Sequence, residues 1–256
     1  MEKYIIALDL DETLLDSKMN ISTYTKETLK KCKEKGMIVA ISSTRGYGSC
    51  KNIAKEIEAD YCCVQSGNSI VDANGNIIYN NAFSKEAVAN FIKEFPEYVS
   101  NFLVDSDENL YGNSTEKVMS IWKAIPCTIE DILNLNVYKM CVHYEPEYQQ
   151  IIENYCKEHG FVCRPMRTDS FLLITPPNSD KFYALEKLLS LHKTDLNHLI
   201  VFGDDNSDSL SIERAKYGVA VQNAREAVLE IAKYVTSSND EDGVATFLNK
   251  FIDENM

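Results

Sequence analysis

Short apolar segments alternate with helical stretches through the N-terminal third of the chain, and this order restricts the possible folds more than any other feature. Strands are predicted at Tyr4–Leu8, Met37–Ile41 and Tyr61–Val64. Helices are predicted from the cap residue Ser22 to about Lys35, before Gly36, and over residues 47–58. Strands and helices in this order pair in parallel through right-handed crossovers. The sequence therefore predicts an α/β fold.

The pattern changes in the middle of the chain. Ile70–Asp72 and Ile77–Tyr79 flank Asn74-Gly75, a residue pair that suits a tight hairpin turn. Helices are then predicted at 84–95, 115–124 and 146–158, and strands near 100–104, 137–144, 161–165 and 170–175. Several of these strands are joined by links too short for a helical crossover. At least part of this second sheet should therefore be antiparallel.

The α/β order returns after Pro176-Pro177. The predicted elements are a helix at Lys181–His192, a strand at Leu199–Phe202, a helix near 207–216, a strand at Gly218–Val221 and a helix at 224–232. We interpret residues 1–82 and 176–256 as a Rossmann-like parallel-sheet core and residues 83–175 as an inserted α+β domain. Both crossings lie near the ligand-binding edge of the core, so we expect the insert to cover that edge.

The charge balance limits the possible partners. The chain has 26 Lys and Arg against 39 Asp and Glu, a formal net charge of −13. Such a field repels nucleic acid and anionic membranes, so neither is expected as a partner. Solubility explains most of these charges. A phosphorylated substrate would have to be attracted locally, by a metal ion and a few cations.

The cysteines and the apolar segments suggest a location. The 8 cysteines contain no C-x-x-C pair, which favours reduced thiols in a cytoplasmic protein. A group with possible zinc ligands matches no closed zinc motif, so packing is the preferred interpretation for Cys141, His143, Cys156, His159 and Cys163. The first apolar run is broken by carboxylates and resembles neither a secretory signal nor a membrane span. We expect a monomer or a weak homodimer.

Two aspartates follow the first predicted strand directly. Ligands bind at the carboxyl ends of the strands in open parallel sheets. Asp9 and Asp11 are two residues apart, so on an extended chain they can face the same point. Carboxylates that close repel each other unless a cation or a shared proton intervenes. A D-x-D pair is usually a solvated turn, but one between an apolar strand and Thr-Leu-Leu indicates a functional site.

Three further elements carry polar groups to comparable places. The second strand ends in Ser42-Ser43-Thr44-Arg45, whose hydroxyls and following helix start could hold phosphate oxygens or could cap the helix. Lys181 opens a helix, an unfavourable place for a cation, and is either functional or an exposed lysine. Gly203-Asp204-Asp205-Asn206-Ser207-Asp208 follows a buried strand and offers clustered oxygen ligands of the kind that Mg²⁺ prefers.

Together these four elements resemble the haloacid dehalogenase superfamily of phosphatases. Within it the chain is similar to the Cof-type sugar-phosphatase branch, in which a cap domain lies between the second and third motifs. The likeness covers nearly the full length and includes Ser66-Gly67-Asn68-Ser69, Gly218–Ala224 and Asp240–Ala245. It implies Mg²⁺-dependent hydrolysis of small phosphorylated metabolites through an aspartyl-phosphate intermediate. It also implies that residues 83–175 are the cap domain.

The resemblance implies a role for each motif residue. Asp9 would be the nucleophile, and Asp11 would protonate the leaving alkoxide and then activate water. Ser43 and Lys181 would hold the phosphoryl oxygens. The expected metal ligands are Asp9, Asp11 through a backbone carbonyl, Asp204, and Asp208 directly or through water. The residues expected to contact the substrate are Leu10, Thr44, Arg45 and Asn223.

Some positions depart from the family pattern without removing a catalytic group. Glu12 stands where Gly or Asp is usual, Ser43-Thr44-Arg45 replaces Thr-Gly-Arg, Gly67-Asn68 inverts the usual Asn-Gly, and Ser207 replaces an Asn.

Three alternative functions remain open. They are a phosphorylatable receiver domain, which would be about half as long, a catalytically inactive phospho-binding relative, and a phosphomutase or other phosphotransferase. A mutase would need cations in the cap, for which the candidates are Lys139, Arg164 and Arg167.

Overall fold

The computed structural model describes residues 3–96, 101–166 and 171–256. The chain forms two compact units. The core unit comprises Met1–Arg45, Cys50–Tyr79 and Asp180–Met256, and the inserted unit comprises Gly46–Ser49 and Asn80–Ser179. Three features of the sequence prediction lie outside the described residues: the first residue of the strand near 100–104, the first residue of the strand at 170–175, and Arg167.

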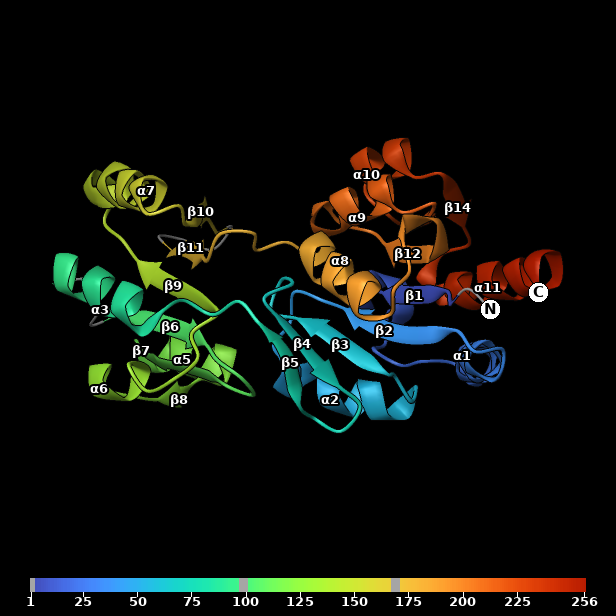
Figure 1. The fold of residues 1–256 in the computed structure, drawn as a ribbon. Coiled ribbons are helices and arrows are strands. Elements are labelled where there is room, and N and C mark those ends of the chain that lie inside the picture. Colours follow the sequence, from blue (N-terminus) through green and yellow to red (C-terminus); the bar gives the residue numbers. More distant parts are fainter. Residues whose placement is uncertain (1–2, 97–100, 167–170) are drawn as a thin grey trace. The chain divides into compact units, whose positions relative to one another are not determined.

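An eight-stranded sheet forms the centre of the core unit (Figure 1). Its strands are β1 (Ile5–Leu8), β2 (Ile38–Ser42), β3 (Tyr61–Val64), β4 (Ser69–Asp72), β5 (Ile77–Asn80), β12 (Leu199–Gly203), β13 (Tyr217–Val221) and β14 (Tyr234–Thr236). They lie in the order β14-β13-β12-β1-β2-β3-β4-β5. Pairing is parallel from β14 to β3, and β4 runs antiparallel to β3. The predicted parallel-sheet core is therefore confirmed.

Strand β1 lies in the interior of this sheet, between β2 and β12. All four of its residues are completely buried. Parallel strands covered on both faces have apolar residues at every position, which explains the unbroken run Ile-Ile-Ala-Leu. Burial of a side chain such as Ile6 or Leu8 contributes roughly 1.5–3 kcal/mol. The strand that delivers the first aspartates is thus fixed at the centre of the core.

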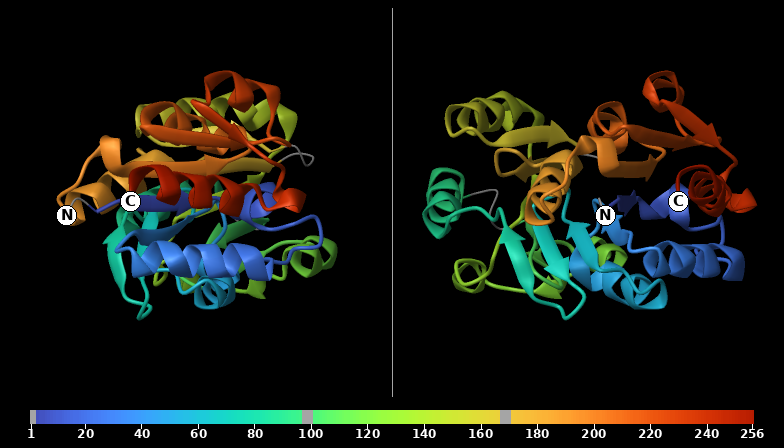
Figure 2. Two further views of the ribbon diagram at one scale, coloured as in Figure 1. Left: turned by 90° about the vertical axis from the view of Figure 1, so that its right-hand side faces the viewer. Right: turned by 45° about the vertical axis from the view of Figure 1, so that its right-hand side comes forward.

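Helices cover both faces of the core sheet (Figure 1). They are α1 (Thr23–Glu34), α2 (Tyr47–Glu56), α8 (Lys181–Leu191), α9 (Ser209–Arg214), α10 (Glu226–Ile231) and α11 (Gly243–Asn255). Residues of α8, α9 and α10 pack with Ile5 and Ala7 in one apolar cluster. Helices α1 and α11 lie side by side (Figure 2), and the Asn249 side chain donates hydrogen bonds to Tyr24 and Thr28 over 3.0 and 2.9 Å. Helix α11 and β14 were not predicted from the sequence.

Local hydrogen bonds explain where the predicted elements begin and turn. The Ser22 hydroxyl accepts a bond from the Thr25 amide at 3.0 Å, so the predicted cap of α1 is confirmed. Between β4 and β5, Asp72 accepts bonds from the amides of Asn74 and Asn76 at 2.9 and 2.8 Å. Gly75 has a φ of +86°, which glycine adopts without strain, and this turn forms the predicted hairpin.

The inserted unit contains a six-stranded sheet in the order β10-β11-β9-β6-β7-β8. The strands are β6 (Phe102–Asp105), β7 (Leu110–Asn113), β8 (Ile125–Pro126), β9 (Lys139–His143), β10 (Val162–Pro165) and β11 (Phe171–Thr175). Its described helices include α3 (Lys85–Glu94), α5 (Glu116–Trp122), α6 (Ile129–Ile132) and α7 (Gln149–Glu158). Among the described strand pairs of this sheet, β7–β8 is parallel and the others are antiparallel, as predicted for part of this sheet. The short elements β7, β8 and α6 were not predicted.

One helix of the inserted unit begins later than expected. The predicted helix at 146–158 starts with a separate 3-10 turn at Pro146–Tyr148, and α7 follows from Gln149.

Within the described ranges, no helix has the length and hydropathy needed to cross a bilayer.

Candidate active site

The candidate site lies where the strand order of the core sheet reverses. From β1 the chain continues to β2 on one side, and β12 pairs with the other side of β1. Ligands of doubly wound sheets bind at such a switch point, outside the carboxyl ends of the strands. Asp9 and Asp11 follow β1, Ser43 follows β2, and Asp204 follows β12. The topology alone therefore brings three of the four sequence motifs to one edge.

A tight loop after β1 carries the first two aspartates. We call residues Asp9–Ser17 the β1 loop. Its turn at Leu10–Leu14 closes with a bond from the Leu15 amide to the Leu10 carbonyl at 2.9 Å, and both Leu10 and Leu14 are buried. Glu12 lies in the left-handed region with a φ of 54°. A residue with a Cβ atom adopts this conformation at a cost of roughly 1–2 kcal/mol, so other contacts must stabilise the turn.

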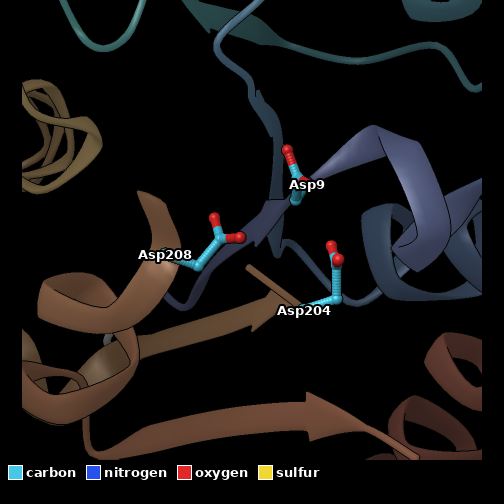
Figure 3. Close-up of side chains that lie close together, drawn as sticks. All are labelled: Asp9, Asp204 and Asp208. Atoms are coloured by element: carbon cyan, nitrogen blue, oxygen red, sulfur yellow. The ribbon is translucent and has the colours of Figure 1, made fainter. Parts of the chain in front are cut away.

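Three buried carboxylates converge beside this loop (Figure 3). Asp9, Asp204 and Asp208 each offer one oxygen, and these oxygens lie within 4.8 Å of one another. Asp9 comes from the end of β1, Asp204 from the end of β12, and Asp208 from the turn that precedes α9. The three residues are only 7%, 7% and 1% exposed. Carboxylates this close and this buried repel each other unless a cation or a proton intervenes.

Lys181 supplies one positive charge to the cluster. Its ammonium nitrogen lies 2.7 Å from an oxygen of Asp9 and 2.7 Å from an oxygen of Asp208. The residue is 2% exposed, so the alternative interpretation of an exposed helix lysine is wrong. Asp180 caps α8 by accepting a bond from the Phe182 amide, which fixes the first turn of the helix. Placement at the start of α8 thus directs the lysine into the site.

Charge within the cluster remains unbalanced. Burial raises the pKa of Asp204, and repulsion from Asp9 adds to this effect. Burial also raises the pKa of Asp208, against the opposing attraction of Lys181. Burial alone would lower the pKa of Lys181, but the attraction of Asp208 and Asp9 outweighs it and the pKa is raised. When all three carboxylates are ionised, one ammonium leaves the site net negative, and a divalent cation would balance this charge.

The donor set suits a hard cation. Carboxylate oxygens are the ligands that Mg²⁺ takes from proteins, together with water and substrate phosphate. Thr13 donates its hydroxyl to one oxygen of Asp204 at 2.9 Å and leaves the other oxygen for a ligand. The second oxygen of Asp208 faces the Asp205 amide at 3.3 Å, so protein groups contact both of its oxygens. Asp9 and Asp204 therefore fit a metal ion best, and Asp208 fits a supporting role.

Asp11 lies outside the carboxylate cluster and pairs with Arg45. The Arg45 Nε atom donates to one oxygen of Asp11 at 2.8 Å, and a terminal guanidinium nitrogen contacts the other oxygen. Such two-point contacts fix both the position and the orientation of a carboxylate. The Asp11 side chain is half exposed, whereas that of Arg45 is 24% exposed. The sequence did not indicate this pairing.

A cavity of about 200 Å³ opens over these groups. Its lining residues are Asp9, Asp11, Glu12, Thr44, Lys181, Asp204, Asp205, Ser207, Asn223 and Arg225. Four predicted site residues do not line it, namely Leu10, Ser43, Arg45 and Asp208. Leu10 is fully buried, and Ser43 is 1% exposed and accepts a bond from the Arg45 amide at 3.2 Å. Thr13, Asp205 and Arg225 were not predicted. Thr13 belongs to the first motif, and this position could have indicated that it is a functional residue.

This site belongs to a phosphoryl-transfer enzyme of the α/β class, since carboxylates, a buried lysine and hydroxyl groups meet at the switch point of a doubly wound sheet. The chain is a member of the haloacid dehalogenase-like hydrolase family, whose model matches residues 6–248. The resemblance seen in the sequence motifs is thereby confirmed, and the protein is a phosphatase.

Relatives of known activity match along nearly the whole chain. The chain is 27% identical to the 5-amino-6-(5-phospho-D-ribitylamino)uracil phosphatase YitU of Bacillus subtilis, over 97% of each chain. It is 25% identical to the phosphatase YwtE of that organism, which carries the same description, over 96% of this chain and 97% of the relative. A solved structure from Thermotoga maritima superposes with a TM-score of 0.86 at 23% identity, covering 98% of this chain and 97% of that one.

Proposed function

We propose that this protein is a Mg²⁺-dependent phosphatase that hydrolyses small phosphomonoesters, such as sugar or polyol phosphates, through an aspartyl-phosphate intermediate. The observation that carries the proposal is the position of Asp9. Its carboxylate follows the central strand, contacts Lys181 at 2.7 Å and lines the cavity. A nucleophile at this place can reach a phosphate whose charge is balanced by the surrounding groups.

The first chemical step requires an attacking oxygen and a proton donor. An oxygen of Asp9 forms the new bond to phosphorus while the bond from phosphorus to the ester oxygen breaks. Asp11 gives its proton to that ester oxygen, which leaves as an alcohol. Both residues line the same cavity, which supports this division of roles. Lys181 balances negative charge on the phosphoryl oxygens as the transfer proceeds.

The second step returns the enzyme to its starting state. Asp11, now ionised, takes a proton from a water molecule as that water attacks phosphorus. The bond from phosphorus to Asp9 breaks, and inorganic phosphate leaves. The two-point contact of Arg45 fixes the position and orientation of the Asp11 carboxylate for this step.

A bound Mg²⁺ would neutralise phosphoryl charge and orient the phosphate toward the nucleophile. Asp9, Asp204 and the Asp11 backbone carbonyl are the ligands that we propose, with Asp208 in support. The cluster of buried carboxylates supports this assignment, since one lysine does not balance its charge.

The alternative of a phosphomutase gains no support from the described cap candidates. Lys139 is mostly buried and forms an ion pair with Asp105 at 3.0 Å, and Arg164 is exposed. The similar proteins YitU and YwtE are 5-amino-6-(5-phospho-D-ribitylamino)uracil phosphatases, which act on a small phosphorylated compound. These observations favour hydrolysis of a small phosphorylated metabolite over transfer within a diphosphorylated sugar.

A hydrolysis screen tests the proposed function. Sugar phosphates, polyol phosphates, nucleotides and pyridoxal phosphate are incubated with the enzyme and Mg²⁺, and phosphate release is measured. We expect release from at least one class of small phosphomonoester and its loss in excess chelator. Full activity in chelator would contradict the metal requirement. The role of residues 83–175 as a cap that restricts access stays a prediction, which rapid dephosphorylation of an intact phosphoprotein would refute.

Mg²⁺ is expected to stabilise the protein, and more so at neutral than at acidic pH. Because the pKa values of Asp204 and Asp208 are raised in the fold, the metal-free protein binds more protons than the unfolded chain above the ordinary carboxyl pKa of about 4. The contribution of these two groups to stability therefore falls as pH rises. Mg²⁺ needs the ionised carboxylates, so the increase in Tm should be larger at about pH 7.5 than at about pH 5.

Two variants control this measurement. Asp204→Asn keeps an oxygen that can accept the Thr13 bond but removes one charge, so the shift caused by Mg²⁺ should shrink. Asp253→Asn changes a carboxylate of α11 whose side chain is 77% exposed and should leave the shift intact. An undiminished shift in Asp204→Asn would show that the metal binds elsewhere.

Asp11→Asn is expected to lower kcat by roughly 10²–10⁴-fold with an alkyl phosphate, because the leaving alkoxide then receives no proton. The loss should be much smaller with p-nitrophenyl phosphate, whose leaving group needs no protonation. The measurement is kcat for the two esters with both proteins. Equal losses on both esters would count against a role for Asp11 as an acid.

A further inference from the structure

The C-terminal segment Ser238–Asp242 contacts the β1 loop at three points. The Asn239 side chain donates a bond to the Leu15 carbonyl at 2.9 Å. Asp240 accepts a bond from the Ser17 amide at 2.7 Å and another from the Ser17 hydroxyl at 2.6 Å. This segment overlaps the Asp240–Ala245 motif at Asp240–Asp242, and no role has so far been assigned to that motif. Its contacts connect the end of the core unit to the loop that carries the first two aspartates.

Asn223 extends the same chain of contacts toward the catalytic residues. It follows β13, and its Nδ2 atom donates a bond to the Glu12 carbonyl at 2.7 Å. Its Oδ1 atom accepts a bond from the Asn239 amide at 3.0 Å. A donor contact at one end and an acceptor contact at the other fix the orientation of the amide. Asn223 therefore connects the turn of the β1 loop to the segment Ser238–Asp242, whose Asn239 side chain binds the Leu15 carbonyl.

The bond to Glu12 is made at the strained point of the loop. Glu12 has a φ of 54°, and it stands between Asp11 and Thr13. A non-glycine residue keeps such a conformation only where its surroundings hold it. Thr13 in turn donates to Asp204 at 2.9 Å. If the Glu12 peptide rotated, the residues on both sides would move, and with them the proton donor and one partner of the carboxylate cluster.

We propose that Asn223 and Asn239 are positioning residues, which hold the carbonyls of Glu12 and Leu15 so that Asp11 meets the substrate oxygen in the correct place. This inference rests on the proposed role of Asp11 as general acid. It assigns Asn223 a function through the β1 loop, in contrast to the direct substrate contact expected from the sequence. Asn223 also lines the cavity, so the experiment has to separate the two roles.

The test compares Asn223→Ala, Asn223→Asp and Asn239→Ala with the unmodified enzyme on an alkyl phosphate and on p-nitrophenyl phosphate. We expect each variant to lower kcat for the alkyl ester by about 10- to 100-fold, the range for misplacement of a reacting group by up to an ångström. KM should change by less than about threefold, and the loss with the aryl ester should be several times smaller. Asn223→Asp keeps an acceptor for Asn239 but has no donor for Glu12, so it should be impaired like Asn223→Ala.

Asn249→Ala is the matched control. Its amide nitrogen contacts Tyr24 and Thr28 of α1 at 3.0 and 2.9 Å and the Ala245 carbonyl of its own helix at 3.1 Å. This variant should lower Tm and leave the ratio of the two kcat values unchanged. If Asn223 had a purely structural role, the Asn223 variants would also show a lower Tm and an unchanged ratio of the two kcat values. A change in KM alone would indicate direct substrate contact. Full activity of Asn223→Asp would show that the Glu12 bond is not required. Each of these three outcomes overturns the proposal.

The proposed function is judged separately from the positioning role. The unmodified enzyme must first release phosphate from the alkyl ester in a manner that depends on Mg²⁺. If it does not, the proposed function fails before any variant is compared. If it does and the ratio of kcat values in Asn223→Ala is unchanged, only the positioning role fails.

Discussion

Replacement of Asp9 by asparagine is expected to abolish turnover while the protein stays folded. The attacking oxygen is lost, because an amide is a very poor nucleophile toward phosphorus, whereas the volume of the side chain is unchanged. The backbone N–H of residue 9 can still donate to the Phe202 carbonyl at 3.2 Å, so the end of β1 stays in place. Repulsion within the carboxylate cluster also falls. The measurements are phosphate release with the best substrate of the screen and thermal unfolding.

The control for this variant is the same chemical change away from the site. Asp195 caps the short turn before β12 by accepting a bond from the Asn197 amide at 2.9 Å, and asparagine can cap in the same way. Asp195→Asn should keep activity within about threefold, because Asp195 does not line the cavity and surface substitutions of this kind usually change stability little. Phosphate release close to normal from folded Asp9→Asn protein would refute the assignment of the nucleophile.

Lys181→Ala is expected to reduce both activity and stability. Loss of one preorganised charge donor to a transferring phosphoryl group should lower kcat by about 10²–10³-fold. Asp9 and Asp208 would also lose the ammonium that lies 2.7 Å from each of them. Removal of one partner from a buried ion pair costs roughly 3–5 kcal/mol of folding free energy. Both quantities are measurable on one preparation, by phosphate release and by denaturant unfolding.

Lys187 on the same helix provides the comparison. It is exposed and lies 5.9 Å from the ring centroid of Tyr79, a contact worth only about 0.5–1 kcal/mol at such a site. Lys187→Ala should therefore leave kcat unchanged and alter stability little. Mg²⁺ should recover part of the stability lost in Lys181→Ala, because it also balances the carboxylates. A loss of activity below about threefold in Lys181→Ala would mean that the lysine has only a structural role.

The convergence of the motifs was predictable because it depends on strand order. Asp9, Ser43 and Asp204 each follow an apolar strand, and parallel strands end at one edge. The side-chain pairings were not predictable in this way. Asp11 with Arg45, Thr13 with Asp204 and Asn223 with Glu12 depend on loop conformation and on residues distant in the sequence. Periodicity indicates which end of a strand carries a residue, but not how the following loop turns.

The elements missed in the fold have a similar explanation. Strand β14 has three residues, two of them exposed, and β8 has two exposed residues, so neither gives the apolar signal of a buried strand. Helix α11 is held by tertiary contacts, such as that between Phe247 and Phe202 at 5.5 Å between ring centroids. Burial of Lys181 could not be inferred either, since its two partners lie 27 and 172 positions away.

The interior position of β1 has a consequence for biosynthesis. Ile5 pairs with Ile38 on one side and with Leu199 on the other. While the ribosome is still making the inserted unit, one edge of β1 therefore has no native partner. Exposed apolar edges of this kind invite association with other chains. The nascent protein thus passes through a long stage in which this edge is unpaired, and its catalytic groups come together only after β12 has emerged.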